Sequence, residues 1–560
     1  MKRKINTLII LLLAVFEVSS QGNKIWSTYY GGPSNEVNPV GGPLVATDLS
    51  GNVFLTGYTY SSSGISSGGF QNNFGGLVDG YLVKFNSSGN RLWATYFGGS
   101  NADYVYGLIT DISGNVYVSG KTASTSSVSS SGHQNAFGGG TFDAFLIKFD
   151  TNGNRIWATY YGGTGDEVGN SISVDINGNV YLTGMTESSS NISSGGFQNS
   201  LNGLRDAFLV KFNSSGTRLW ATYYGGSSVE SGNATALDTY GNVYLAGSTN
   251  SSSNISLGGF QNAIGGSTDA FLAKFDSNGN RIWASYYGGI NIDIANCMLC
   301  SQTGNIYIAG YTLSTNAISF NGFQNTFAGG INQGDAFLAK FDSVGNRIWA
   351  SYYGGTNDDY CLSITKDNSG NIYMGGDTYS NTGIAINGFQ NILQGTENEF
   401  IAKIDSLGNL HCATYFGVNH DEDGHIAVDQ SGFIYLAGGT QSTSGIASGG
   451  FQNSFGGGGT DSYLAKFSTT CLNVGVAEEN SIKGFSLYPN PNNSSFNLKL
   501  ETEINNGEII IINDIGQNIY TQPVFKGLNE ISFKELSKGL YTYLLFQNKV
   551  RIGTGKIIVE

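Results

Sequence analysis

Seven carboxylates recur at one fixed place in this sequence and are its most regular candidates for chemistry. Each lies four positions past a Gly-Gly pair, with Gly417-Val418 replacing that pair in the last case. The seven residues are Glu36, Asp103, Glu167, Glu230, Asp293, Asp359 and Glu422. As a ring, they could hold a cation such as calcium or a polyhydroxylated ligand. The alternative, which their strict repetition favours, is that each carboxylate caps backbone amides in its own repeat.

One loop departs from this regularity with residue types that bind metals. It contains His420, Asp421, Asp423 and His425. Hard cations prefer oxygen ligands and zinc favours His and Cys, so this mixture names no particular metal. We therefore assign no cofactor from the sequence and keep calcium as the candidate cation.

The cysteine spacing and the common enzyme motifs point to no further chemistry. Cys297 and Cys300 lack the second pair or the His partners of a zinc site, and they would lie on opposite faces of a strand. The sequence contains no nucleophile elbow, phosphate loop or HExxH pattern. These observations give no support to metal, redox or common hydrolase chemistry.

The elements that must position these residues belong to a repeat of about 63 residues. The string WATYYGG, or a close variant, begins at six tryptophans and once at a cysteine: Trp26, Trp93, Trp157, Trp220, Trp283, Trp349 and Cys412. Between copies come a D-x-x-G-N turn, a run such as VYLTG, a Ser-rich loop ending in GGFQN, and a run such as DAFLVKF. Short β-branched and aromatic runs bounded by such turns are typical of strands and hairpins. Each repeat therefore predicts four antiparallel strands, the blade of a β-propeller.

The two ends of the repeat region predict how the ring closes. The DAFLVKF-type run at 461–467 has no WATYYGG after it, and the first copy, KIWSTYYGG at 24–32, has no DAFLVKF before it. Pairing these strands would complete seven blades and remove the exposed sheet edges. We expect an all-β chain whose residues 21–470 form a seven-bladed β-propeller.

The repeat resembles the SBBP family of bacterial β-propeller repeats. The resemblance rests on the recurring D-x-x-G-N-V-Y, G-F-Q-N, D-A-F-L-x-K-F and W-x-T-Y-x-G-G pieces and covers roughly residues 21–470. It implies a propeller on an exported protein and implies no particular chemistry.

The composition changes after Cys471. A linker at 471–482 leads into alternating apolar strands over 483–560, which predict a small Ig-like β-sandwich. This segment is similar to the sorting domain of the type IX secretion system of Bacteroidetes, through Tyr488, Pro489, Asn490, Pro491, Gly539, Tyr541 and Lys556. The resemblance implies the type IX secretion machinery as a partner, and a product that is secreted or attached to the outer-membrane surface.

The N-terminus and the overall charge support this route. Lys2, Arg3 and Lys4 precede an apolar run at 8–16, which predicts a signal peptide over residues 1–20. No later run reaches the roughly 20 apolar residues of a membrane span, so we expect no transmembrane segment in the mature protein. The net charge of −14 disfavours nucleic acid as a partner.

Chain direction separates two faces of the predicted propeller. The tight hairpins lie on one face, and the Ser-rich loops and the links after WATYYGG lie on the other, which we call the long-loop face. Since binding residues concentrate on loops, we expect a non-enzymatic binding or scaffold protein that engages glycans or surface proteins there. The alternative is a carbohydrate-active enzyme, a glycoside hydrolase or lyase, at the acidic channel mouth, because catalytic carboxylates need not be close in sequence.

Overall fold

The computed structural model describes residues 24–36, 44–301, 303–419, 421–468, 485–488, 495–500, 505–513, 518–532, 538–548 and 550–559. The chain divides into two compact units, residues 1–473 and 474–560. All regular elements in the described residues are β-strands, and none of these residues forms a helix that could cross a membrane. The predicted signal peptide and linker lie outside the described residues, so their boundaries remain predictions.

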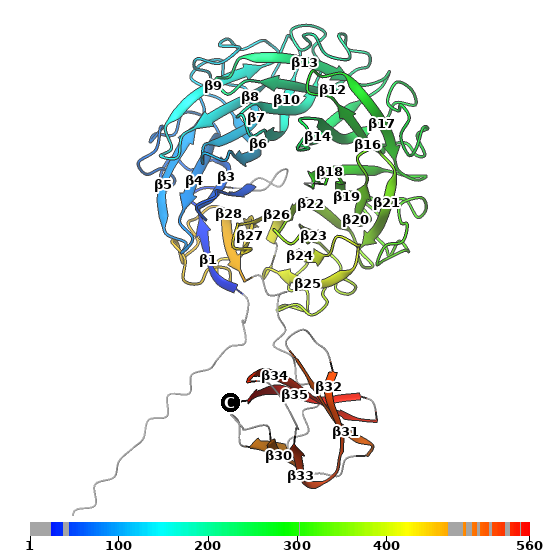
Figure 1. Cartoon of the computed structure of the whole chain (residues 1–560). Helices are drawn as coiled ribbons and strands as arrows, with labels where there is room; N and C mark the ends of the chain where they lie inside the picture. Colours follow the sequence, from blue (N-terminus) through cyan, green and yellow to red (C-terminus); the bar gives the residue numbers. More distant parts are fainter. Residues whose placement is uncertain are drawn as a thin grey trace, which may run out of the picture. The chain divides into compact units, whose positions relative to one another are not determined.

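The first unit is a β-propeller of four-stranded antiparallel sheets arranged around a common centre (Figure 1). Blades 1 to 3 consist of β2 (Leu44–Thr47), β3 (Val53–Thr59), β4 (Asp79–Phe85) and β5 (Arg91–Phe97); β6 (Asp103–Thr110), β7 (Val116–Thr122), β8 (Asp143–Phe149) and β9 (Arg155–Tyr161); and β10 (Glu167–Val174), β11 (Val180–Thr186), β12 (Asp206–Phe212) and β13 (Arg218–Tyr224). Blades 4 to 6 consist of β14 (Glu230–Leu237), β15 (Val243–Thr249), β16 (Asp269–Phe275) and β17 (Arg281–Tyr287); β18 (Asp293–Cys300), β19 (Ile306–Thr312), β20 (Asp335–Phe341) and β21 (Arg347–Tyr353); and β22 (Asp359–Lys366), β23 (Ile372–Thr378), β24 (Asn398–Ile404) and β25 (Leu410–Phe416).

The seventh sheet closes the ring as the unmatched strands predicted. It contains β26 (Asp421–Val428), β27 (Ile434–Thr440), β28 (Asp461–Phe467) and, from the other end of the propeller, β1 (Lys24–Tyr30). Strands β1 and β28 are antiparallel, with Trp26 opposite Lys466 and Tyr30 opposite Ser462. This pairing uses the free edges of both terminal strands, so the sheet is complete only when the two ends meet.

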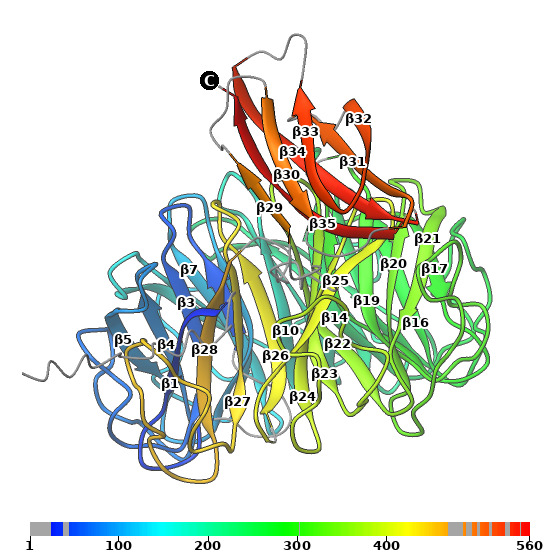
Figure 2. The ribbon, with the colours of Figure 1, turned by 90° about the horizontal axis from the view of Figure 1, so that it is seen from below.

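The strands of each blade run between two faces (Figure 2). The turns after the first and third strands of a blade lie on one face, and the loop after the second strand and the link to the next blade lie on the long-loop face. In the D-x-x-G-N turn of blade 4, Asp238 Oδ1 accepts hydrogen bonds from the amides of Tyr240 (3.0 Å) and Asn242 (2.9 Å). Gly241 supplies the positive φ of 83° that closes this turn.

The tryptophans share one register because each joins neighbouring blades. Trp220 Nε1 of blade 3 donates a hydrogen bond to the Ser277 carbonyl of blade 4 (2.9 Å), and the indole is buried. The turn that carries Ser277 contains Gly279, at φ 83°, where a Cβ would lie 2.7 Å from the indole ring. The repeat therefore conserves a large ring in one blade and a glycine in the next because the two are in direct contact.

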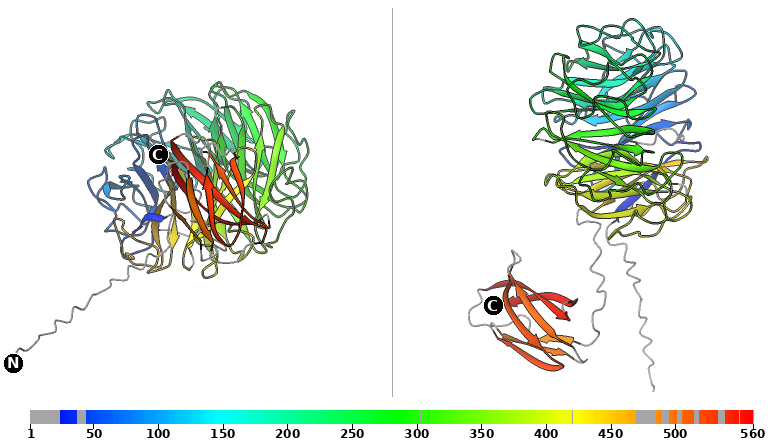
Figure 3. Two further views of the ribbon diagram at one scale, coloured as in Figure 1. Left: turned by 60° about the horizontal axis from the view of Figure 1, so that its bottom comes forward. Right: turned by 90° about the vertical axis from the view of Figure 1, so that its right-hand side faces the viewer.

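The second unit contains two sheets that share one apolar core (Figure 3). One sheet has the order β29 (Phe485–Tyr488), β30 (Ser495–Leu500) and β33 (Gly527–Ser532). The other has the order β32 (Asn518–Val524), β31 (Gly507–Ile512), β34 (Gly539–Gln547) and β35 (Val550–Val559). Buried side chains from both sheets, including Phe496 and Leu545, form the core. Two facing sheets agree with the predicted small β-sandwich, and the finer Ig-like strand order remains a prediction.

Candidate functional site

The ring carboxylates whose side chains the structure describes are buried and hydrogen-bonded inside their blades. Glu230 Oε2 accepts from the Gly226 amide (2.8 Å) and Glu230 Oε1 accepts from the Thr249 hydroxyl (2.7 Å). The same arrangement occurs at Asp103, Glu167, Asp293 and Asp359, and the hydroxyl of Thr59 donates to Glu36. In this conformation the carboxylates cap local backbone, the alternative that their repetition favoured. Binding of a cation or polyhydroxylated ligand by the ring remains a prediction, and it would require these hydrogen bonds to break.

A second set of buried carboxyl groups faces the first. A Cβ placed on Gly31 would lie 2.3 Å from Asp461 Oδ1 and 2.6 Å from Glu36 Oε2, so the two groups approach each other around this glycine. Burial raises the pKa of Glu36 to about 8, with repulsion from Asp461 adding to the shift, and burial raises the pKa of Asp461 to about 6. Two facing carboxyl oxygens are stabilised when they share a proton, which is the situation that the raised pKa values describe.

The strand register in blade 7 moves the ring position by one residue. Asp421 lies opposite Thr440, as Asp293 lies opposite Thr312 in blade 5, whereas Glu422 lies opposite Gly439. The link before β26 is one residue shorter than the others, so counting from the Gly-Val pair gave Glu422 where the register gives Asp421. The side chains of both residues lie outside the described part of the structure.

The predicted metal-binding loop falls largely outside the described residues. This holds for His420 and for the side chains of Asp421 and Asp423. His425 is half-buried in β26, opposite Ala437, and lines the central channel. Among the described residues, no group of three His, Cys, Asp or Glu side chains could hold a metal ion. Metal binding by this loop remains a prediction.

The residues of the predicted sorting motif are distributed over the second unit. Tyr488 ends β29 and is exposed, Gly539 and Tyr541 lie in β34, and Lys556 pairs with Thr542 across β34 and β35. Pro489, Asn490 and Pro491 lie outside the described residues. The role of these positions in sorting remains a prediction.

The GGFQN pieces serve the packing between blades. The Phe260 ring of blade 4 lies under the Arg347 guanidinium of blade 5, 4.5 Å from the ring centroid. Three other blades repeat this contact, through Phe70 with Arg155, Phe197 with Arg281, and Phe451 with Arg91. Gln261 Nε2 donates to Asp269 Oδ2 (2.9 Å) and so ties the loop to its own blade. In this conformation an Arg guanidinium packs on each of these rings, so the GGFQN residues join neighbouring blades.

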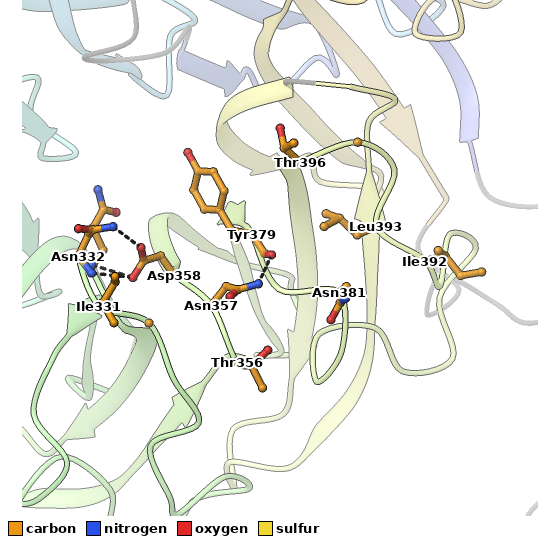
Figure 4. A pocket seen from close by; sticks show the side chains of 13 residues that line it. Ile331, Asn332, Thr356, Asn357, Asp358, Tyr379, Asn381, Ile392, Leu393 and Thr396 are labelled. Carbon is orange, nitrogen blue, oxygen red and sulfur yellow. Dashed lines mark hydrogen bonds between the residues drawn. The ribbon is translucent and has the colours of Figure 1, made fainter.

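The clearest departure from blade symmetry is a pocket on the long-loop face between blades 5 and 6 (Figure 4). Its volume is about 1010 Å³, which is sufficient for an oligosaccharide. One wall is the loop between β19 and β20, which includes Ile331 and Asn332, and the opposite wall is the loop between β23 and β24, which includes Ile392 and Thr396. The loop between β19 and β20 is longer than its equivalents in the other blades, and the loop between β23 and β24 has the usual length with a different sequence, so this pocket has a lining of its own.

Asp358 holds the first wall in place. Its Oδ1 accepts hydrogen bonds from the backbone amides of Asn332 (3.1 Å), Gln333 (2.9 Å) and Gly334 (2.9 Å), and its Oδ2 accepts from Asn332 Nδ2 (3.1 Å). Partial burial acts to raise the pKa of Asp358, but these hydrogen bonds outweigh it and lower the pKa below its usual value. The carboxylate therefore stays charged and fixes the loop before any ligand arrives.

The floor of the pocket presents an aromatic ring and several amides and hydroxyls. Tyr379 is 37% exposed and stands between the two walls, with Asn357, Asn381 and Thr356 around it (Figure 4). Asn357 Nδ2 donates to the Tyr379 carbonyl (2.8 Å), which fixes the backbone that carries the ring. Aromatic faces with convergent amides and hydroxyls suit ligands that combine apolar ring faces with hydroxyl groups.

The sequence carries one signal for this pocket, an insertion that departs from the repeat. The stretch between GFQN and the following DAF is longest in blade 5, where it reads TFAGGINQG, compared with AIGGST in blade 4. Such an insertion is absent from the motifs that the repeats share. The extra residues include Ile331, which is 89% exposed at the pocket.

Two protein families match parts of the chain. Residues 25–64, 92–126, 156–191 and 348–383 match the SBBP beta-propeller repeat. The chain is thus a β-propeller protein with SBBP repeats, as the recurring motifs indicated. At its C-terminus, residues 486–560 are a secretion system C-terminal sorting domain, which supports secretion or attachment to the cell surface.

Curated relatives share only part of their length with this chain. An uncharacterized WD repeat-containing protein of Acanthamoeba polyphaga mimivirus is 20% identical over 358 residues, which cover 54% of this chain and 26% of that protein. The regulatory protein FlaEY of Caulobacter vibrioides is 25% identical over 186 residues, which cover 30% of this chain and 18% of that protein. The matched region thus spans about a quarter or less of either relative.

Several solved structures are similar at low scores. A protein of unknown function from Dyadobacter fermentans has a TM-score of 0.37 and 9% identity, covering 80% of this chain and 98% of that one. PorZ, a surface component of the type IX secretion system of Porphyromonas gingivalis, has a TM-score of 0.31 and 13% identity, covering 92% and 70%. An α-L-arabinanase of Penicillium chrysogenum has a TM-score of 0.37 and 8% identity, covering 79% and 98%. No conclusion about function follows from these values.

Proposed function

We propose that this protein is an exported, non-enzymatic binding protein, and that the pocket between blades 5 and 6 holds a glycan. The observation that carries the proposal is the combination of Tyr379 with surrounding amides and hydroxyls in one pocket on the long-loop face. The exported glycan binder acts in the medium or on the outer-membrane surface, where the sorting domain and the type IX secretion machinery deliver it.

The chemistry of the pocket favours a neutral sugar. Sugar rings have apolar faces that stack on aromatic side chains, and their hydroxyls exchange hydrogen bonds with amides such as Asn381 and hydroxyls such as Thr356. The lining residues include neither Lys nor Arg, so the pocket offers no cationic partner for a uronic acid or a phosphate. Ile331 and Ile392, which are 89% and 74% exposed, add apolar surface at the two rims.

The same pocket is poorly suited to glycoside cleavage. Hydrolysis of a glycosidic bond normally uses two carboxyl groups on opposite sides of the bond. Among the residues that line the pocket, Asp358 is the one carboxylate, and its oxygens already accept hydrogen bonds from the neighbouring loop. We therefore favour binding over catalysis at this site.

A polysaccharide panel tests the proposal directly. The exported full-length protein is run in native gels containing xylan, mannan, laminarin, dextran or soluble starch, with and without calcium, and product release is measured in parallel. The pocket variant is Tyr379→Ala, and the matched control is Tyr240→Ala, an 84% exposed tyrosine on the hairpin face. We expect retardation by at least one polysaccharide, about two- to tenfold weaker in Tyr379→Ala and unchanged in Tyr240→Ala, because one stacked ring contributes about 0.5–1.5 kcal/mol.

Each other outcome contradicts a stated part of the proposal. Release of sugar products would show an enzyme. Retardation that is equal in both variants would place the binding site elsewhere. Failure to bind any polysaccharide, combined with retention on a surface protein, would replace the glycan with a protein ligand.

A further inference from the structure

Two cysteines from neighbouring blades face each other where the innermost strands of blades 5 and 6 pack together. Cys297 lies in β18 and Cys361 in β22, 64 residues apart in sequence. Their sulfur atoms are 4.0 Å apart. Cys361 is fully buried, and Cys297 is half-buried at the wall of the central channel.

The surrounding backbone holds the two strands in this relative position. Asn296 Nδ2 of blade 5 donates to the Cys361 carbonyl of blade 6 (3.0 Å), directly beside the two sulfurs. The thiols otherwise have long contacts, from Cys297 to the Ala309 carbonyl (3.6 Å) and from Cys361 to the carbonyls of Gly375 (3.5 Å) and Ser363 (3.5 Å). The sulfurs would have to approach by about 2 Å to reach the S–S bond length of about 2.05 Å.

Cys300, the cysteine nearest to Cys297 in sequence, packs on the other side of β18. Cys300 packs with the cluster that joins blades 4 and 5, whereas Cys297 packs with the cluster that joins blades 5 and 6. The C-x-x-C spacing therefore brings two cysteines onto opposite faces of one strand. The pair that can react is Cys297 with Cys361, which no sequence spacing suggests.

The compartment favours oxidation of this pair. The sorting domain supports export, and disulfides form and persist outside the cytoplasm. A further cysteine of the propeller, Cys412, is disulfide-bonded in the structure. Burial raises the pKa of the Cys297 thiol well above its usual value, so the thiolate that starts the reaction is rare in the folded blade pair. Oxidation is therefore expected while blades 5 and 6 assemble.

We propose that Cys297 and Cys361 form a disulfide that fastens blade 5 to blade 6 in the exported protein. The oxidant is a disulfide, either that of a thiol–disulfide oxidoreductase or oxidised glutathione. One thiol, as its thiolate, attacks the oxidant to give a mixed disulfide, and the second thiol attacks that intermediate. The two cysteines lose two protons and two electrons and form one S–S bond, and the oxidant is reduced to two thiols.

Peptide mapping of the intact exported protein tests this proposal. The protein is denatured without reductant in N-ethylmaleimide, which blocks free thiols, and is digested with trypsin. Cleavage after Arg281, Lys340, Arg347 and Lys366 places Cys297 and Cys361 on different peptides. We expect one linked species of the two peptides, which disappears on reduction, with a single maleimide on Cys300.

Two variants separate the proposal from the other pairings. Because Cys297 and Cys300 share a peptide, Cys300→Ser should retain the linked species and Cys297→Ser should lose it. A sample unfolded, reduced and refolded with oxidised glutathione should regain the same link. Maleimide on both Cys297 and Cys361 in the exported and the refolded samples would overturn the proposal. So would a link from Cys361 to Cys300, or glutathione remaining on Cys361.

Discussion

Asp358 should control the order of the pocket wall without controlling the fold, and Asp358→Ala tests this. The substitution removes the acceptor of the backbone amides of Asn332, Gln333 and Gly334. A hydrogen bond to a charged acceptor contributes about 1.5–3 kcal/mol net of exchange with water, and the three bonds share one partly exposed carboxylate, so their contributions do not add. We therefore expect the free energy of local opening to fall by about 1.5–3 kcal/mol, and exchange of these three amides to become about 10- to 100-fold faster.

Hydrogen exchange followed by mass spectrometry measures this effect, and the chain offers a matched control. Asp166 caps the equivalent loop of blade 2, accepting from the amides of Thr141 (2.5 Å) and Phe142 (3.3 Å), and it lines no part of the pocket. Asp166→Ala should loosen its own loop and leave residues 329–334 and polysaccharide retardation unchanged. Asp358→Ala should weaken retardation about tenfold while the thermal midpoint stays within about 2 °C of the wild type. Unchanged exchange at 332–334 in Asp358→Ala would refute the reasoning.

Three further predictions concern the propeller itself. Trp220→Ala should destabilise the propeller by about 3–5 kcal/mol in urea unfolding, because the buried indole contacts the next blade. The control, Tyr240→Ala at an exposed position, should change stability by less than about 0.5 kcal/mol. Equal effects would contradict the role of Trp220 in joining two blades. Burial raises the pKa of Asp79 to about 7, so the folded protein keeps a proton that the unfolded chain releases near pH 4. The stability that this group contributes should therefore fall as pH rises from about 4 to 7, by about 1.4 kcal/mol per pH unit. Asp79→Asn, which reproduces Asn398 at the same position of blade 6, should flatten that slope, and an unchanged slope would argue against the shift. Reduction of a Cys297–Cys361 disulfide should lower the unfolding free energy by about 4 kcal/mol, the chain-entropy value for a loop of this length. The Cys297→Ser variant lacks this disulfide, so reductant should lower its unfolding free energy by about 4 kcal/mol less than that of the wild type.

The propeller could be predicted from the sequence because the same signals recur in each repeat. The tryptophan register, the hairpin turns and the unmatched strands at 24–30 and 461–467 each constrain the same sheet pairing. In blade 7 the link is one residue shorter, so strand register places Asp421 opposite the threonine where spacing places Glu422, and which of the two belongs to the ring remains a prediction. Repetition predicted where the ring carboxylates recur, but only the packing around Glu230 shows that its carboxylate is buried and capped.

The single features of the molecule could not be predicted in this way. The pocket depends on how an insertion around Ile331 folds against a loop from the next blade, and no sequence period contains that information. The contact between Cys297 and Cys361 crosses a blade boundary, so it follows from the ring and from the relative twist of two sheets. In a repeated fold, a unique site arises where one repeat deviates, and its geometry requires the neighbouring repeat as well.

The most direct test of the proposed glycan site is a hydrogen-exchange footprint of the full-length exported protein with the polysaccharide that retards it most. The proposal predicts protection concentrated in residues 329–334, 356–358 and 392–396, with little change in the turns of the hairpin face. Protection confined to that face or to the second unit, or the absence of protection at saturating polysaccharide, would contradict the proposal that the pocket between blades 5 and 6 is the binding site.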